Sequence, residues 1–218
     1  MTNQTAVQGA TGLALLATVL LELMPGLQSA IGEGALLREL AVRGVGYVRQ
    51  IRETVFDDES VRAFDLAISL EVAQLLSADQ AISHVEALVR HSNLIVFSAA
   101  IPGQGSRGCD SSERWQDEWA HEFQSRGYYA IDAIRPRIWD LDTLDAAFRQ
   151  NTILYANLAG LERYPALLAD RVSSLPSLRV VHPAVWAART DSIRLRIPLG
   201  RNISVSVRKT VERSKGLA

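Results

Sequence analysis

Short apolar runs alternate with segments of helical periodicity along most of the chain. The apolar runs predict six strands, at residues 27–31, 45–51, 64–70, 94–99, 128–134 and 152–157. Apolar residues at helical spacing predict helices at 12–24, 35–41, 78–90, 111–126 and 141–149, and residues 158–168 could form another. Val180–Pro183 predicts an extended segment or a turn. Strands alternating with helices indicate an α/β protein, with a mostly parallel sheet covered by helices on both faces.

The strongest apolar run, at 12–24, predicts a helix that is either buried or interfacial. It is shorter than the roughly 20 apolar residues that a membrane span needs. Residues 1–11 contain no basic residue, as a signal peptide would require. Pro25-Gly26 follows and ends the helix in the expected way. We therefore predict no membrane span.

Composition narrows the possible functions. A length of 218 residues predicts one sizeable domain, and a formal net charge of −1 gives no field that attracts nucleic acid or anionic membrane. The single cysteine, Cys109, excludes an internal disulfide and a cysteine-based metal cluster. The four histidines have no metal-ligand spacing. We predict no metal site, no nucleic-acid partner and a cytoplasmic location.

Four segments together resemble the second half of class I S-adenosylmethionine-dependent methyltransferases. They are Phe64–Val72, Asn93–Gly103, Ile131–Trp139 and Arg149–Tyr155. The resemblance is strongest to the bacterial small-molecule group, whose members often occur among sugar and natural-product genes. It implies a Rossmann-like fold, with an antiparallel edge hairpin at the C-terminal end of the sheet. The implied division is a methyltransferase-like domain at 1–160 and an extension at 161–218 that packs on it and ends in a basic tail.

The resemblance also implies S-adenosylmethionine as the cofactor, although the cofactor motifs depart from the family pattern. The family's first strand ends in an acidic residue and a glycine-rich turn, which lets the backbone approach the cofactor. Here Gly32-Glu33-Gly34 keeps two glycines before a helix, with Gln28 or Ala30 at the acidic position. A plain strand-to-helix turn is the alternative interpretation. The implied cofactor-binding residues are Gly32, Glu33, Gly34, Gln50, Ser69 and Leu70.

The second strand of the family usually ends in a carboxylate that binds the ribose. The residue at that place here is Gln50, which is uncharged. Glu53, slightly farther on, could substitute only if the loop bends back. The loop at 52–63 is also shorter than the family's, which usually contains a further strand.

Two acidic residues are candidate catalytic bases. Relatives read Glu-Val-x-Glu-His-Leu after the third strand, and this chain reads Glu71 to Leu76 without the histidine. Asp110 stands where relatives have a histidine. An ordinary Asp does not share the near-neutral pKa on which histidine catalysis depends. Glu71 could instead cap the following helix.

Aromatic and basic residues farther along are candidates for binding the acceptor. Trp115 could form an aromatic wall or simply pack on the sheet. Arg135 and Arg137 come just after a strand and are followed by Trp139. Two arginines in a loop suit recognition of an anion, and salt bridges to nearby aspartates are the alternative.

Two functions remain open. The first is methyl transfer from S-adenosylmethionine to an oxygen or nitrogen of a small, sugar-like or natural-product acceptor, and the resemblance favours it. The second is a methyltransferase-like protein that does not methylate and either acts with a protein partner or as a homodimer, or uses the pocket for another reaction. Its support is that several polar cofactor and proton-transfer positions are replaced together, and a fold alone does not establish function.

Overall fold

The computed structural model describes residues 2–32, 34–50, 64–104 and 113–192. Six strands lie in this part of the chain: β1 (Ser29–Gly32), β2 (Tyr47–Gln50), β3 (Leu66–Leu70), β4 (Leu94–Ser98), β5 (Tyr129–Ile131) and β6 (Ile153–Ala156). The α-helices are α1 (Thr2–Leu23), α2 (Ala35–Val42), α3 (Ala78–His91), α4 (Gln116–Gln124), α5 (Arg135–Ile138), α6 (Ala146–Asn151), α7 (Leu158–Arg163) and α8 (Pro183–Ser192). Three short 3₁₀ turns lie at Ala73–Leu75, Pro165–Asp170 and Leu175–Leu178.

The strands form one sheet in the order β2-β1-β3-β4-β6-β5. Strands β1 to β4 are mutually parallel, while β6 runs antiparallel to both β4 and β5. The predicted α/β fold with an antiparallel C-terminal edge is therefore confirmed, and the arrangement is Rossmann-like. The chain leaves β1 for β2 in one direction and later leaves β3 for β4 in the other, so β1 and β3 border the topological switch point.

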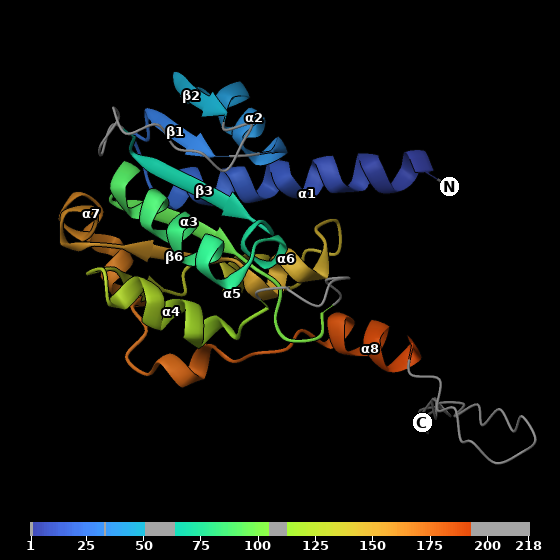
Figure 1. Ribbon diagram of the computed structural model, residues 1–218. Helices are drawn as coiled ribbons and strands as arrows, with labels where there is room; N and C mark the ends of the chain where they lie inside the picture. The colour runs from blue at the N-terminus through green and yellow to red at the C-terminus, as the bar shows by residue number, and fades with distance from the viewer. Residues whose placement is uncertain (1, 33, 51–63, 105–112, 193–218) are drawn as a thin grey trace, which may run out of the picture.

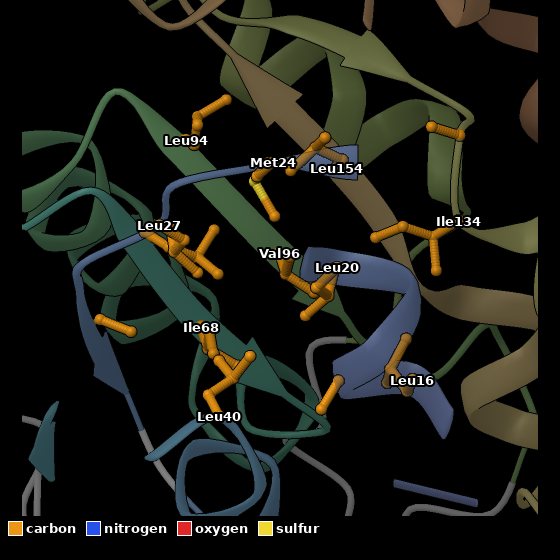
Figure 2. Packing of buried hydrophobic residues seen from close by; sticks show 14 of the residues in the cluster. Leu16, Leu20, Met24, Leu27, Leu40, Ile68, Leu94, Val96, Ile134 and Leu154 are labelled. Carbon is orange, nitrogen blue, oxygen red and sulfur yellow. The ribbon is translucent and has the colours of Figure 1, made fainter. Parts of the chain in front are cut away.

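Helices cover both faces of the sheet (Figure 1). Side chains of α1 and α2 pack on the face that carries Ile68 and Val96, and Figure 2 shows Leu20 of α1 beside Val96. Side chains of α3 and α4 pack on the opposite face, around Phe97. The alternation of strand side chains between two apolar clusters explains why the strands read as nearly continuous apolar runs.

The C-terminal half of α1 is a buried helix, in agreement with the first interpretation of the 12–24 run. Leu16, Leu20 and Met24 have no exposed surface. The helix starts at Thr2, well before the predicted position, and its N-terminal part extends beyond the sheet in Figure 1. No helix in the described ranges combines the length and the apolar character needed to cross a membrane.

Other helix boundaries differ from the predictions for local reasons. The helix predicted at 141–149 begins at Ala146, because the Asp145 side chain accepts a hydrogen bond from the Ala147 N–H at 2.8 Å and caps it. The helix proposed at 158–168 ends at Arg163, just before Pro165. Pro183 begins α8 where an extended segment or turn was predicted, since proline suits the first helical position. The predicted division at residue 160 stays a prediction, and the basic tail lies outside the described residues.

Candidate functional site at the carboxyl edge of the sheet

The carboxyl ends of the parallel strands lie along one edge of the sheet. Gly32, at the end of β1, pairs with Gln50, at the end of β2, and Leu70, at the end of β3, pairs with Ser98, at the end of β4. Four of the residues that close these strands or follow them, Gly32, Gln50, Leu70 and Glu71, are therefore brought to a common edge. Ligands of open α/β sheets bind at this edge, beside the topological switch point.

The two described glycines of the β1–α2 turn have different physical roles. A Cβ on Gly32 would lie 2.4 Å from the Ile68 carbonyl oxygen, so this glycine allows β1 and β3 to approach each other. Gly34 has φ +82°, which favours glycine, and a Cβ there would meet no atom of the described residues within 4 Å. It precedes α2, whose first turn receives no side-chain cap. No described residue therefore fills the space beside Gly34, and Glu33 itself lies outside the described residues.

Glu71 follows β3 in a backbone conformation that is uncommon for a residue with a side chain, with φ +57°. Its N–H donates to the Ser98 carbonyl oxygen at 2.8 Å. Its Oε1 accepts hydrogen bonds from Ser98 Oγ and, at 3.5 Å, from Asn151 Nδ2, while Oε2 accepts from Gln74 Nε2 at 3.0 Å. Burial raises the pKa of the Glu71 carboxyl, and the bonds from Ser98 and Asn151 partly oppose that shift.

Glu71 belongs to a larger network of buried amide side chains. Asn151 Nδ2 also donates to Gln104 Oε1 at 3.0 Å, and Asn151 Oδ1 accepts from Gln150 Nε2 at 2.8 Å. Gln116 Nε2 donates to the Val180 carbonyl oxygen at 3.1 Å and, at 3.5 Å, to Asn151 Oδ1. Sequence reasoning missed these residues, because an isolated Gln or Asn carries no signal until the fold brings several together. Gln116 Oε1 is buried and has no hydrogen-bond donor among the described residues.

The side chain of Ser69 faces away from this network. Its Oγ lies 2.8 Å from Nε2 of His84 on α3, and both residues are buried. Burial lowers the pKa of His84 to about 4, so this histidine is neutral at physiological pH. Leu70, the next residue, packs against the apolar cluster under α1.

The two candidate tryptophans lie beside segments of the C-terminal region. Trp139 and His182 have ring centroids 4.5 Å apart. His182 N–H donates to Gln150 Oε1 at 2.8 Å, which connects this pair to the amide network. Trp115 precedes Gln116, and the Arg179 guanidinium lies 5.8 Å from the Trp115 ring centroid. The aromatic residues thus adjoin the network without being part of it.

The two candidate arginines are engaged by the protein itself. Arg135 is 3% exposed, donates to both carboxylate oxygens of Asp132 at 2.8 and 2.6 Å, and donates to the Leu178 carbonyl oxygen at 3.0 Å. Arg137 donates to the Ala133 carbonyl oxygen and pairs with Asp170 at 3.4 Å. The aspartates closest in sequence after them are not their partners. Asp110, the second candidate base, lies outside the described residues.

No protein-family model and no curated protein matches the sequence. Among solved structures, the small RNA methyltransferase HEN1 is 14% identical with a TM-score of 0.44, over 67% of this chain and 26% of that one. Phosphoethanolamine N-methyltransferase 1 of Haemonchus contortus, in complex with phosphoethanolamine and S-adenosylhomocysteine, is 13% identical with a TM-score of 0.44. That match covers 85% of this chain and 50% of the other. The chain thus spans half or less of each structure, and these likenesses concern the fold alone.

Proposed function

We propose that this chain binds S-adenosylmethionine at the switch point between β1 and β3 and methylates an oxygen or nitrogen of a small, sugar-like or natural-product acceptor. The supporting observation is the pairing of two features at that point. An open, left-handed glycine, Gly34, follows β1, and a carboxyl group with a raised pKa, Glu71, follows β3. Clefts at such switch points are the usual ligand sites of open α/β sheets.

The β1–α2 turn fits part of the cofactor. The uncapped first turn of α2 offers backbone N–H groups and a partial positive charge, which suit the carboxylate of the methionine moiety. Gly34 leaves room for that group to approach the backbone. The site offers only weak acceptors for the hydroxyl groups of the ribose. Strands β1 and β2 end in Gly32 and Gln50, and neither residue has a carboxylate. When bound, the cofactor supplies an electrophilic methyl group.

Glu71 is the proposed proton acceptor. A carboxylate offers about four lone-pair sites, and side chains of the protein occupy three of them. The remaining site lies on Oε2, which accepts a bond only from Gln74 among the described residues. Methyl transfer to a positioned nucleophile needs proximity and modest deprotonation, so Glu71 could serve without a histidine.

The amide network is proposed to orient the acceptor. Gln104 and Asn151 lie within hydrogen-bond reach of each other, and Asn151 reaches Glu71. Buried amides present both donors and acceptors, which suits the hydroxyl groups of a sugar-like molecule. Trp115 and Trp139 would supply apolar walls, since each lies beside the network.

Calorimetric titration with S-adenosylmethionine and S-adenosylhomocysteine tests the proposal. We expect both to bind with micromolar dissociation constants, and an acceptor screen with methyl-labelled cofactor would then follow. A folded protein that binds neither compound at about millimolar concentration would contradict the proposal, because a cofactor site is expected to have a dissociation constant well below about 1 mM.

A second candidate function is a methyltransferase-like protein that does not methylate and acts as a partner-binding subunit or homodimer, or uses the pocket in a different natural-product reaction. One observation favours it: three of the lone-pair sites of Glu71 are used within the fold, where they join the end of β3 to the 73–75 turn, to β4 and to α6. The same titration separates the two functions. Absence of cofactor binding, together with co-purification of a defined partner, would favour this second function.

A further inference from the structure

A pocket of about 460 Å³ lies at the amino edge of the sheet, opposite to the carboxyl edge that carries the candidate site. It is bordered by the end of α4, the start of β5 and the segment after α7. Because β5 runs in the same direction as β4, the first residue of β5 lies at the amino edge, away from Glu71. The volume falls within the range of small-molecule pockets, about 300–1,000 Å³. Six of its nine lining residues are aromatic or aliphatic: Tyr128, Tyr129, Ala130, Leu168, Val172 and Leu175.

The pocket contains one charged residue, Arg171, in a defined position. Its guanidinium lies over the Tyr129 ring, 3.9 Å from the centroid. Its backbone is fixed, because Arg171 forms an antiparallel bridge with Ile131 and the Val172 N–H donates to the Ala130 carbonyl oxygen at 3.0 Å. The segment thus extends the sheet beyond β5, which holds Arg171 and Tyr129 together.

Arg171 differs from other arginines of this region in having no carboxylate partner among the described residues. Arg126, on the nearby end of α4, pairs with Glu86 at 2.9 Å and with Glu122 at 2.5 Å. Arg137 pairs with Asp170. The stacked guanidinium of Arg171 therefore keeps its N–H fork available at the edge of the plane, where a carboxylate binds.

We propose that this pocket binds a small molecule with a flat body and a single carboxylate. The Tyr129 ring and the aliphatic side chains suit the faces of the body, the polar part of the lining suits its edge, and the guanidinium fork suits the carboxylate. A phosphate monoester carries roughly −1.5 to −2 charges, which one arginine balances less well. The hydroxyl of Tyr128 is already committed to the Ser92 and Val89 carbonyl oxygens, at 2.5 and 3.0 Å, so Arg171 is the main anchor.

Titration of the protein with 2-naphthoate tests the proposal. The neutral analogue 2-naphthamide has the same shape without the charge and is the control ligand. A ligand of this size is expected to bind with an affinity of about millimolar or tighter. Binding is measured by amide chemical shifts in NMR, which also locate the site. We expect shifts at residues 128–130 and 168–175, and binding of the amide to be weaker by about tenfold or more.

Three variants complete the design. Arg171→Gln removes the guanidinium, and Leu168→Asp places a negative charge at a position that is 50% exposed and can accept it without unfolding. Arg43→Gln removes an equal charge from α2, where Arg43 pairs with Glu39, and is the control. The first two variants should weaken 2-naphthoate binding by about tenfold or more, while the control leaves it unchanged.

Several outcomes would overturn the proposal. They are shifts confined to other residues, equal binding of naphthoate and naphthamide, unchanged binding by Arg171→Gln, or no binding at about ten millimolar ligand. None of these outcomes bears on the cofactor site, because the pocket and Gly34 lie at opposite edges of the sheet.

Discussion

Ser98 and Glu71 are joined twice across the ends of two neighbouring strands. The Glu71 N–H donates to the Ser98 carbonyl oxygen at 2.8 Å, and the Ser98 hydroxyl donates to Glu71 Oε1. The first bond holds the backbone of Glu71 in its left-handed conformation, and the second stabilises the ionised carboxylate. Together they fix a half-buried carboxyl group at the edge where parallel sheets bind ligands.

The Ser98→Ala variant should destabilise the protein in a pH-dependent manner. The lost hydroxyl stabilises the ionised form of Glu71, so its removal should cost about 2 kcal/mol at about pH 8. At pH 4.5, the ordinary pKa of a Glu carboxyl, Glu71 is more than half protonated in the folded protein because burial raises its pKa, so the cost should be smaller than at the higher pH. Urea unfolding at the two pH values measures the difference.

Ser69→Ala is the matched control for this prediction. Ser69 and Ser98 are both fully buried serines on neighbouring strands, but Ser69 contacts the neutral imidazole of His84. Its replacement should cost nearly the same free energy at both pH values, because an imidazole with a pKa of about 4 stays mostly neutral at about pH 4.5. An equal pH response of the two variants would contradict the assigned role of Ser98.

His84 should make the protein sensitive to acid. Its pKa is lowered from 6.5 to about 4 by burial, so the unfolded chain binds a proton at a higher pH than the folded protein does. The stability that this group contributes is fully present above pH 6.5 and is lost as the pH falls toward 4. This lowering of the pKa corresponds to about 3 kcal/mol of the free energy of unfolding.

Replacing His84 by leucine should make the free energy of unfolding depend less on pH between pH 6.5 and about pH 4. Urea unfolding from pH 8 to about pH 4 measures it, and NMR titration of the imidazole gives the pKa directly. A measured pKa near 6.5 would refute the explanation even if the protein were acid-sensitive.

The sequence predicted the strands well and the site only in part, for physical reasons. Runs such as 64–70 and 94–99 are apolar on both faces because helices cover both sides of the sheet, so composition alone reveals them. The position of Glu71 at the end of β3 followed from the same pattern. The partners of Glu71 could not be predicted, since Asn151 lies 80 residues away and contacts it only because β6 is inserted beside β4.

Arg135 shows how tertiary contacts override a local interpretation. A pair of arginines after a strand suits anion binding, and its expected alternative was pairing with aspartates farther along the chain. In the structure Arg135 pairs with Asp132, which precedes it, and also donates to Leu178. The contact with Leu178 depends on where residues 172–180 cross the molecule, which no local pattern in the sequence indicates.

The two arginines should differ sharply in their effect on stability. Arg135→Gln breaks a pair in which the arginine is almost fully buried, so we expect a loss of about 3 kcal/mol. Arg137→Gln removes a pair in which the arginine side chain is 43% exposed, so the loss should be under about 1 kcal/mol. Thermal and urea unfolding compare them. Similar losses would show that the buried pair of Arg135 with Asp132 is not a major source of stability.

The most direct test of the cofactor site compares the glycines at the two ends of α2. Gly34 and Gly44 both have positive φ, at +82° and +97°, and a Cβ on either would meet no atom within 4 Å. Alanine is strained at both positions, so urea unfolding first establishes that each variant is folded, and only Gly34 borders the carboxyl edge. Calorimetric titration with S-adenosylhomocysteine should show binding about tenfold weaker for Gly34→Ala and unchanged for Gly44→Ala. Equal affinities of the two folded variants, or no binding by the unaltered protein, would contradict a cofactor site at this turn.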